Sequence, residues 1–217
     1  MNPALTLPGV RFLGTLFVFL FVASFPASAV PLYEATTPRT FADWCLNKTT
    51  ESLEARHTVN VLLQVANTPD CHQAEKLLST LTELSLYDKQ ITDLRPLSTL
   101  TNLTALSLSK NQITDLMPLS TLTNLTVLFL GNNSIADLKP LSTLTNLIHL
   151  KLNKNQIIDL KPLSTLTNLN RLDLFNNSIA DIKSLSSLTN LTRLDLSNNQ
   201  ILTDKACPVK PASICSF

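Results

Sequence analysis

The sequence predicts a repeat solenoid of the α/β class, with short parallel strands forming a concave sheet and tight turns forming the convex side. Three observations lead to this prediction. Leucine-rich stretches recur every 22 residues, the same eleven residues stand at Asp137–Leu147 and Asp159–Leu169, and apolar residues alternate with variable ones just after these stretches. A fixed period of this kind indicates stacked units that share one core.

Six repeats stand in register, and we number their positions 1 to 22 from the leucine that opens each one. The opening leucines are Leu81, Leu103, Leu125, Leu147, Leu169 and Leu191. Positions 1, 4, 6, 11, 14, 17 and 20 are leucine or isoleucine almost throughout, which no single repeat could bury. Stacked repeats would bury them against one another, with adjacent strands about 4.8 Å apart.

The first half of each repeat predicts a strand followed by a turn. Leu150 and Leu152 alternate with His149 and Lys151, and a period of two places one face inward. Position 9 is asparagine in five repeats, where its amide could tie the turn to the neighbouring coil. This structural ladder comprises Asn111, Asn133, Asn155, Asn177 and Asn199.

The second half of each repeat predicts short 3-10 turns and extended chain. Position 16 is proline in four repeats, as at Pro140, and proline is excluded from a helix interior. We expect the leucines at positions 17 and 20 to point inward, and the aspartate at position 13 to cap each turn.

The two ends of the chain depart from the repeat. Residues 1–29 have the order of a secretory signal peptide: Arg11, the apolar run Phe12–Phe25, and then Ala27-Ser28-Ala29. The alternative is an uncleaved membrane or lipid anchor, but the run of 14 residues would reach only about 21 Å as a helix. The organisation expected is therefore signal peptide 1–29, helical N-terminal cap 30–80, repeats 81–202 and C-terminal cap 203–217.

The N-terminal cap reads as three helices within 40–48, 51–67 and 70–79. Asp70 is the expected N-cap of the third, Leu77 and Leu78 are expected to enter the first coil, and Trp44 is expected to anchor the cap's core.

The four cysteines predict two disulfides. An even number of cysteines in an exported chain favours pairing. Five or six coils separate the ends by roughly 25–30 Å, whereas bridged Cα atoms lie within about 7 Å. We therefore expect Cys45–Cys71 and Cys207–Cys215. A metal site from Cys45, His57, Cys71 and His72 fits no usual zinc spacing.

The outward positions of the strand and turn are the ones that vary between repeats. Exposed positions of the turn half, such as Ser98 and Thr101, hardly change, which favours recognition by the strand face over random drift. The expected partner-binding residues are Tyr87, Phe129, His149, Lys151, Arg171, Asp173, Phe175, Arg193 and Asp195. Lys151 and Asp173 should form a surface ion pair, unless Lys151 pairs with the Phe129 ring instead.

The repeat LxxLxLxxNxIxDLxPLSxLTN resembles the 22-residue leucine-rich repeats of bacterial internalin-type proteins, and the flank from Phe41 to Ser79 resembles small exported leucine-rich repeat proteins of cyanobacteria. The resemblance implies a curved right-handed solenoid that binds protein partners on its concave face, often through exposed aromatic residues. The matching aromatic residues are Tyr87, Phe129 and Phe175.

Other function classes fit the sequence less well. The net charge of +1 is unlike that of a nucleic-acid binder, and there is no glycine-rich phosphate loop or zinc motif. His149 and its neighbours lack an evident nucleophile and oxyanion donors, so we expect no enzyme, cofactor or metal. The function expected is a periplasmic or extracellular protein that binds a protein or peptide, with no membrane span once the signal is cleaved. The alternative is a structural or envelope-associated repeat protein that self-associates.

We predict that export removes residues 1–29. The small residues before Val30 fit the cleavage preference of signal peptidases. N-terminal sequencing of the protein recovered from a secreting bacterial host should begin at Val30. Recovery of the chain with Arg11 and the apolar run still attached would instead support the anchor.

Overall fold

The computed structural model describes residues 39–200 and 206–217, all of which belong to one unit, Thr37–Phe217. The expected signal peptide lies outside the described residues, as do Ile201 and Leu202 of the expected repeat region.

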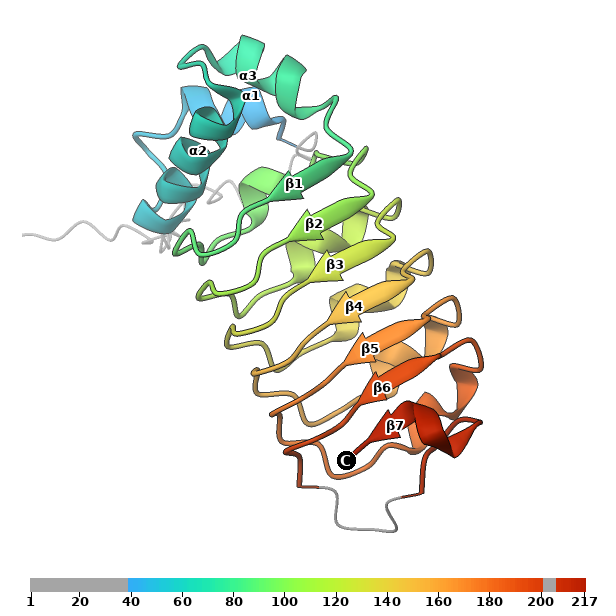
Figure 1. Ribbon diagram of the computed structural model, residues 1–217. Helices are drawn as coiled ribbons and strands as arrows, with labels where there is room; N and C mark the ends of the chain where they lie inside the picture. Colours follow the sequence, from blue (N-terminus) through green and yellow to red (C-terminus); the bar gives the residue numbers. More distant parts are fainter. Residues whose placement is uncertain (1–38, 201–205) are drawn as a thin grey trace, which may run out of the picture. The chain divides into compact units, whose positions relative to one another are not determined.

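The described part of the chain is a solenoid built on one parallel sheet of seven strands in sequential order. In Figure 1 the strands of successive coils lie side by side, with the 3-10 turns behind them. The strands are β1 (Glu83–Ser85), β2 (Ala105–Ser107), β3 (Val127–Phe129), β4 (His149–Lys151), β5 (Arg171–Asp173), β6 (Arg193–Asp195) and β7 (Cys215–Ser216). The fold is therefore the one expected, with a seventh strand that the repeat pattern does not contain.

The period of 22 residues places like positions against like positions. Leu128 of β3 pairs with Leu150 of β4, and Leu150 pairs with Leu172 of β5. Each of these leucines is essentially inaccessible to solvent, and the same holds at positions 6, 11, 14, 17 and 20 through most of the stack. A single continuous core therefore runs through the coils, and it includes residues of both ends.

The asparagine at position 9 joins each coil to the one before it. The Oδ1 atom of Asn155 accepts the backbone N–H of Ile135 at 3.0 Å. Its Nδ2 atom donates to the carbonyls of Leu130 at 3.0 Å and Leu152 at 2.9 Å. The other ladder asparagines repeat this arrangement: Asn111, Asn133, Asn177 and Asn199. Asn155 thus satisfies the buried N–H of Ile135, and it shares the carbonyls of Leu130 and Leu152 with the ladder asparagines of the neighbouring coils.

Position 8 has a backbone requirement that the sequence pattern does not reveal. Its residue is left-handed in all six repeats, with φ between 56° and 58°. Asparagine tolerates this conformation better than most residues, which accounts for Asn132, Asn176 and Asn198. Variation at position 8 is consequently limited by the backbone, so it is no evidence of partner recognition.

The 3-10 helices are η1 (Arg95–Leu97), η2 (Met117–Thr121), η3 (Lys139–Thr143), η4 (Lys161–Thr165), η5 (Lys183–Ser187) and, in the C-terminal segment, η6 (Ala212–Ile214). Four of them lie where the proline pattern predicts them, and η5 forms at the equivalent place although its repeat has Ser184 at position 16. The aspartate at position 13 lies two residues before each of η1 to η5 begins. For example, Asp137 Oδ1 accepts the N–H of Lys139 at 2.9 Å.

Several polar residues of the turn half also connect coils, which explains why they do not change. Thr143 Oγ1 donates to the carbonyl of Ser120, and Asn146 Nδ2 donates to the carbonyl of Thr123, both at 2.9 Å. By contrast, the exposed threonine at position 21 recurs in five repeats with no side-chain hydrogen bond to any described residue. Position 21 is therefore the exposed turn position whose constancy is not explained by a side-chain hydrogen bond. It is the one that supports a real difference between a constant turn half and a variable strand face.

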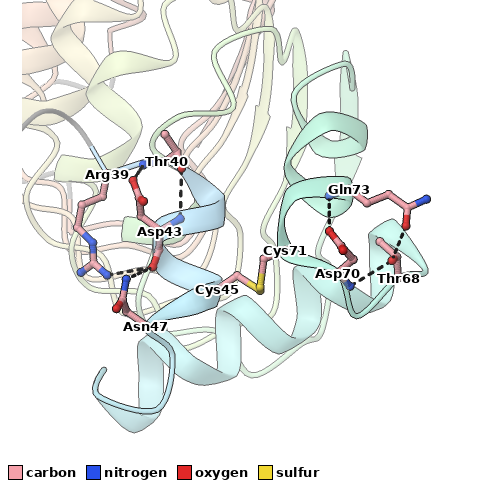
Figure 2. Close-up of a disulfide and its surroundings, with 9 residues drawn as sticks. All are labelled: Arg39, Thr40, Asp43, Cys45, Asn47, Thr68, Asp70, Cys71 and Gln73. Atoms are coloured by element: carbon pink, nitrogen blue, oxygen red, sulfur yellow. Dashed lines mark hydrogen bonds between the residues drawn. A yellow bond between two sulfur atoms is a disulfide. The ribbon is translucent and has the colours of Figure 1, made fainter.

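Three helices cover the first coil: α1 (Phe41–Leu46), α2 (Leu53–Ala66) and α3 (Cys71–Leu78). The disulfide Cys45–Cys71 joins α1 to α3, and Asp70 caps α3 by accepting the N–H of Gln73 (Figure 2). Trp44 is buried in the common core, as expected. Leu78 is buried as well, but Leu77 is 44% exposed, so the expectation that both enter the core is wrong for Leu77. Adjacent residues of a helix point in different directions, and only one of the two faces the coil.

The C-terminal segment closes the other end of the stack. Val209 is buried in the core, and the disulfide Cys207–Cys215 ties the segment to β7. β7 pairs with β6 and accepts a backbone hydrogen bond from Leu196 to the carbonyl of Ser216 at 2.8 Å. The leucines of the last coil are thereby covered. None of the helices in the described segments is both long and apolar enough to cross a membrane.

We predict that Asn155→Ala destabilises the protein by about 2–4 kcal/mol, because it removes the hydrogen bonds of the Asn155 amide and leaves the buried N–H of Ile135 unpaired. Urea unfolding followed by circular dichroism would measure the change. Asn153→Ala is the matched control, since Asn153 precedes the ladder residue by two positions and its side chain makes no hydrogen bond to a described residue. Equal losses in the two variants would contradict the ladder's role.

Candidate binding site on the sheet face

The outward positions of β3 to β6 line one shallow cavity of about 260 Å³. Leu150 and Leu172 contribute to its lining from position 4. The other seven lining residues, which we call the sheet-face site, are Phe129, His149, Lys151, Arg171, Asp173, Arg193 and Asp195. All seven are among the nine residues predicted from the sequence, whereas Tyr87 and Phe175 are outside this lining.

The parallel register arranges the site as two rows that run across the strands. Position 3 contributes His149, Arg171 and Arg193, which are successive partners in β4, β5 and β6. Position 5 contributes the second row, which is Phe129, Lys151, Asp173 and Asp195. A basic row therefore lies beside a row that changes from aromatic to basic to acidic.

Lys151 pairs with an aromatic ring and not with a carboxylate. Its Nζ atom lies 4.6 Å from the centre of the Phe129 ring. The expected ion pair between Lys151 and Asp173 is wrong: within the described residues, the ion pairs are Arg39–Glu51 and Arg95–Asp93. Lys151 lies between Phe129 and Asp173 in its row. The Phe129 ring is an apolar partner that need not lose bound water, whereas the Asp173 carboxylate already accepts the N–H of Phe175.

The two aspartates of the site hold the turns that follow their strands. Asp173 Oδ1 accepts the N–H of Phe175 at 3.1 Å. Asp195 Oδ1 accepts the N–H of Ser197 at 3.0 Å and its hydroxyl at 2.7 Å. Each carboxylate therefore has one oxygen committed to its own chain, a structural role that the sequence reading missed.

Burial raises the pKa of Asp173 above its ordinary value. Desolvation is the largest cause, and the nearby carboxylate of Asp195 acts in the same direction. The hydrogen bond from Phe175 and the charges of Lys151 and Arg193 oppose the increase. Asp173 is thus a carboxylate held in a partly desolvated position, where a charged group of a partner would interact more strongly than at an open surface.

Tyr87 and Phe175 occupy different parts of the same face. Tyr87 follows β1, is 45% exposed, and has Lys110 Nζ 5.0 Å from the centre of its ring. Phe175 lies in the turn after β5 and is only partly exposed. The three aromatic residues named from the sequence therefore do not form one cluster, and Phe129 is the one within the cavity.

A second depression of about 370 Å³ lies on β1 to β3, where the sequence reading named no site. Its outward lining residues are Glu83, Ser85, Ala105, Ser107, Val127 and Phe129. The small side chains at positions 3 and 5 of the second repeat, Ala105 and Ser107, could have predicted this depression from the sequence. Phe129 borders both depressions, so the sheet face combines a nearly uncharged half with a charged half.

Three of the four residues considered for a metal have other partners. Cys45 and Cys71 form a disulfide, and His57 Nε2 lies 2.6 Å from the carbonyl oxygen of Lys89. Among residues 39–200 and 206–217, no three histidine, cysteine, aspartate or glutamate side chains gather in a way that could hold a metal ion.

The repeats match a family model described as "Leucine Rich repeats (2 copies)" at residues 79–122, 123–165, 145–182 and 167–206. These matches cover more than half of the chain. The comparison with curated proteins gives no match.

Two solved structures of bacterial proteins show a similar fold. An internalin of Listeria monocytogenes, InlF, is 30% identical, with a TM-score of 0.66; the match covers 81% of this chain and 49% of the internalin. A leucine-rich repeat protein of Leptospira interrogans is 36% identical, with a TM-score of 0.54, over 62% of this chain and 34% of that one. The chain thus spans about half the length of the internalin it resembles.

We predict that Asp173→Asn stabilises the protein at neutral pH and that this gain disappears in acid. Because the folded pKa is raised, the unfolded state ionises first as the pH rises above about 4, and stability falls until the folded carboxyl has also ionised. The asparagine stays neutral and can still accept the N–H of Phe175. Thermal unfolding from about pH 3 to about pH 8 measures the difference.

Asp159→Asn is the matched control for this experiment. Asp159 also accepts a backbone N–H two residues ahead, from Lys161, but it lies on an exposed turn. The comparison separates the effect of burial from that of replacing the acceptor. A gain for Asp173→Asn that is largest in acid would contradict the prediction.

Proposed function

The chain belongs to the leucine-rich repeat family, and on that premise we propose that it is an exported, non-catalytic protein that binds a protein or peptide through the sheet-face site. One observation carries this proposal. The inward positions repeat almost unchanged, whereas the outward positions 3 and 5 differ between most repeats and line a common cavity. Position 21 of the turn half is also exposed and makes no side-chain hydrogen bond to a described residue, yet it stays threonine in five repeats, so exposure alone does not account for the variation at positions 3 and 5.

Export is supported by features at both ends of the chain. The order of charge, apolar run and small residues over 1–29 fits a secretory signal. The two disulfides require an oxidising compartment to persist, as in the periplasm or outside the cell.

The side chains of the site suit recognition. Arginines and aromatic residues carry much of the binding energy in protein interfaces, and the site presents Arg171, Arg193 and Phe129 together. The guanidinium groups of Arg171 and Arg193 make no hydrogen bond or ion pair with any described residue, so their donors are available to a carboxylate. We assign no catalytic residue.

The size of the face points to a peptide or a protruding loop as the ligand. Six strands at about 4.8 Å, with roughly 15 Å of outward strand and turn, offer on the order of 450 Å². A standard protein interface uses about 800 Å² on each partner. A segment with an apolar side chain over the uncharged half and an acidic group near the arginines would use both depressions.

We predict that Phe129→Ala and Arg171→Ala each weaken partner binding at least about tenfold, because each removes a central contact. Phe175→Ala tests whether the following turn contributes to the same extent. Peptides selected from a random displayed library on the wild-type protein provide the ligands, and calorimetry measures their affinities. Thermal midpoints of the variants should stay within a few degrees of the wild type.

Met117→Ala and Ile158→Ala are matched controls. Both side chains are large, apolar and more than half exposed, but they lie outside the sheet-face site. They should leave the affinity unchanged. If the selected peptides bound the wild type, Phe129→Ala and Arg171→Ala equally well, the site would be elsewhere.

A further inference from the structure

Positions 3 and 5 of the same repeat are chemically matched in several coils. The fifth and sixth repeats both have arginine at position 3 and aspartate at position 5, as Arg171 with Asp173 and Arg193 with Asp195. In the third repeat the same two positions are both apolar, as Val127 with Phe129. The second repeat has two small residues, Ala105 and Ser107.

These matched residues do not satisfy one another within the chain. Each pair stands two residues apart on one strand, and neither arginine lies within 4.0 Å of an aspartate oxygen in the described residues. Across the sheet the register places like against like, because Arg171 is paired with Arg193 and Asp173 with Asp195. Like charges that lie directly opposite are destabilising, and although the charges of Lys151 and Arg193 act on Asp173, no ion pair forms among the described residues of this face.

A second copy can satisfy them in one arrangement. Two sheet faces meet about a twofold axis that lies in the plane between them, and the two directions that keep the strands aligned run along the strands or along the stack of coils. An axis along the strands sets position 3 against position 3, which opposes arginine with arginine. An axis along the stack, midway between positions 3 and 5, sets each coil against its own copy with the strands antiparallel. Position 3 then faces position 5 throughout, including in the fourth repeat, where His149 faces Lys151 of the other copy.

Under this second axis the matched residues meet across the interface. Arg171 faces Asp173 of the other copy, Arg193 faces Asp195, and Val127 faces Phe129, each contact occurring twice by symmetry. Packed sheets are about 10 Å apart, which suits a long arginine opposite a short aspartate. The small residues of the second repeat let the two sheets approach without a clash.

We propose that this face binds a second copy of the chain, forming a twofold dimer held by Arg171–Asp173 and Arg193–Asp195 ion pairs around a Val127–Phe129 contact. The inference rests on the proposed function, because it names a second copy of the chain as one ligand of the sheet-face site. The face is smaller than that of a standard interface, so the dimer is weak, with a Kd on the order of 10⁻⁵ to 10⁻³ M. It occupies the surface that the peptide partner uses, so the two compete.

Charge exchange tests the dimer directly. The all-arginine variant D173R/D195R and the all-aspartate variant R171D/R193D each oppose like charges and should stay monomeric. An equimolar mixture should associate at least about tenfold more tightly than either variant alone, because every arginine again faces an aspartate. Sedimentation equilibrium of the purified proteins, from about 10 μM to about 1 mM, measures these states. Circular dichroism confirms that each variant is folded.

R171Q/R193Q retains Asp173 and Asp195 and the hydrogen bonds that these residues make to the following turns. It therefore provides a second test if a charge-exchange variant does not fold. It should weaken self-association at least about tenfold. K139Q/K161Q, on exposed lysines at the start of η3 and η4, should leave it unchanged. Raising the salt concentration from about 0.05 M to about 0.5 M should also dissociate the wild-type dimer, because its charged contacts are screened.

The outcomes separate this proposal from the peptide-binding function. A wild type that is monomeric at about 1 mM, or a mixture no more associated than its components, overturns the dimer and leaves the peptide experiment intact. Self-association that persists in both charge-exchange variants also overturns it, because a different surface is then responsible. Failure of the selected peptides to compete with a demonstrated dimer would count against the shared site.

Discussion

The structure depends on one constraint: no coil can bury its own leucines. Each repeat presents its apolar residues to the coils on either side, so stability comes from neighbour contacts that recur every 22 residues. The asparagine ladder makes those contacts specific. Asn155 fixes the distance and register between its coil and the one before, since its amide must reach backbone groups of both. The two ends need covers of different design, because they lack a neighbour.

This constraint also explains which residues are free to vary. Position 19 bonds to the preceding coil through residues such as Thr143, and position 22 does so through Asn146. Position 8 must accept a left-handed backbone. Once these demands are met, positions 3 and 5 of the strand remain, and they carry the apolar, basic and acidic side chains of the sheet face. The diversity of this face is thus confined to positions that no coil-to-coil bond restricts.

Much of the fold could be read from the sequence because it follows from spacing. The strands, the 3-10 turns and the N-cap at Asp70 each have a local signal in the chain. The contacts within the site could not be read in this way. Whether Lys151 chooses Phe129 or Asp173 depends on side-chain direction and on the bond that Asp173 already makes to Phe175. β7 was missed because it belongs to no repeat and exists only where the C-terminal segment meets β6.

The short strand β7 makes the protection of one sheet edge depend on the compartment in which the chain folds. A parallel sheet that ended at β6 would leave a row of unpaired backbone groups, to which a strand of another molecule could add. β7 covers that edge with only two residues, and the bridge between Cys207 and Cys215 keeps its segment in place. Without that bridge only the pairing with β6 and the burial of Val209 would hold the segment, so this cover would be weaker in a reducing compartment. The redox state of the compartment in which the chain folds therefore determines how firmly this edge of the sheet is protected from other strands.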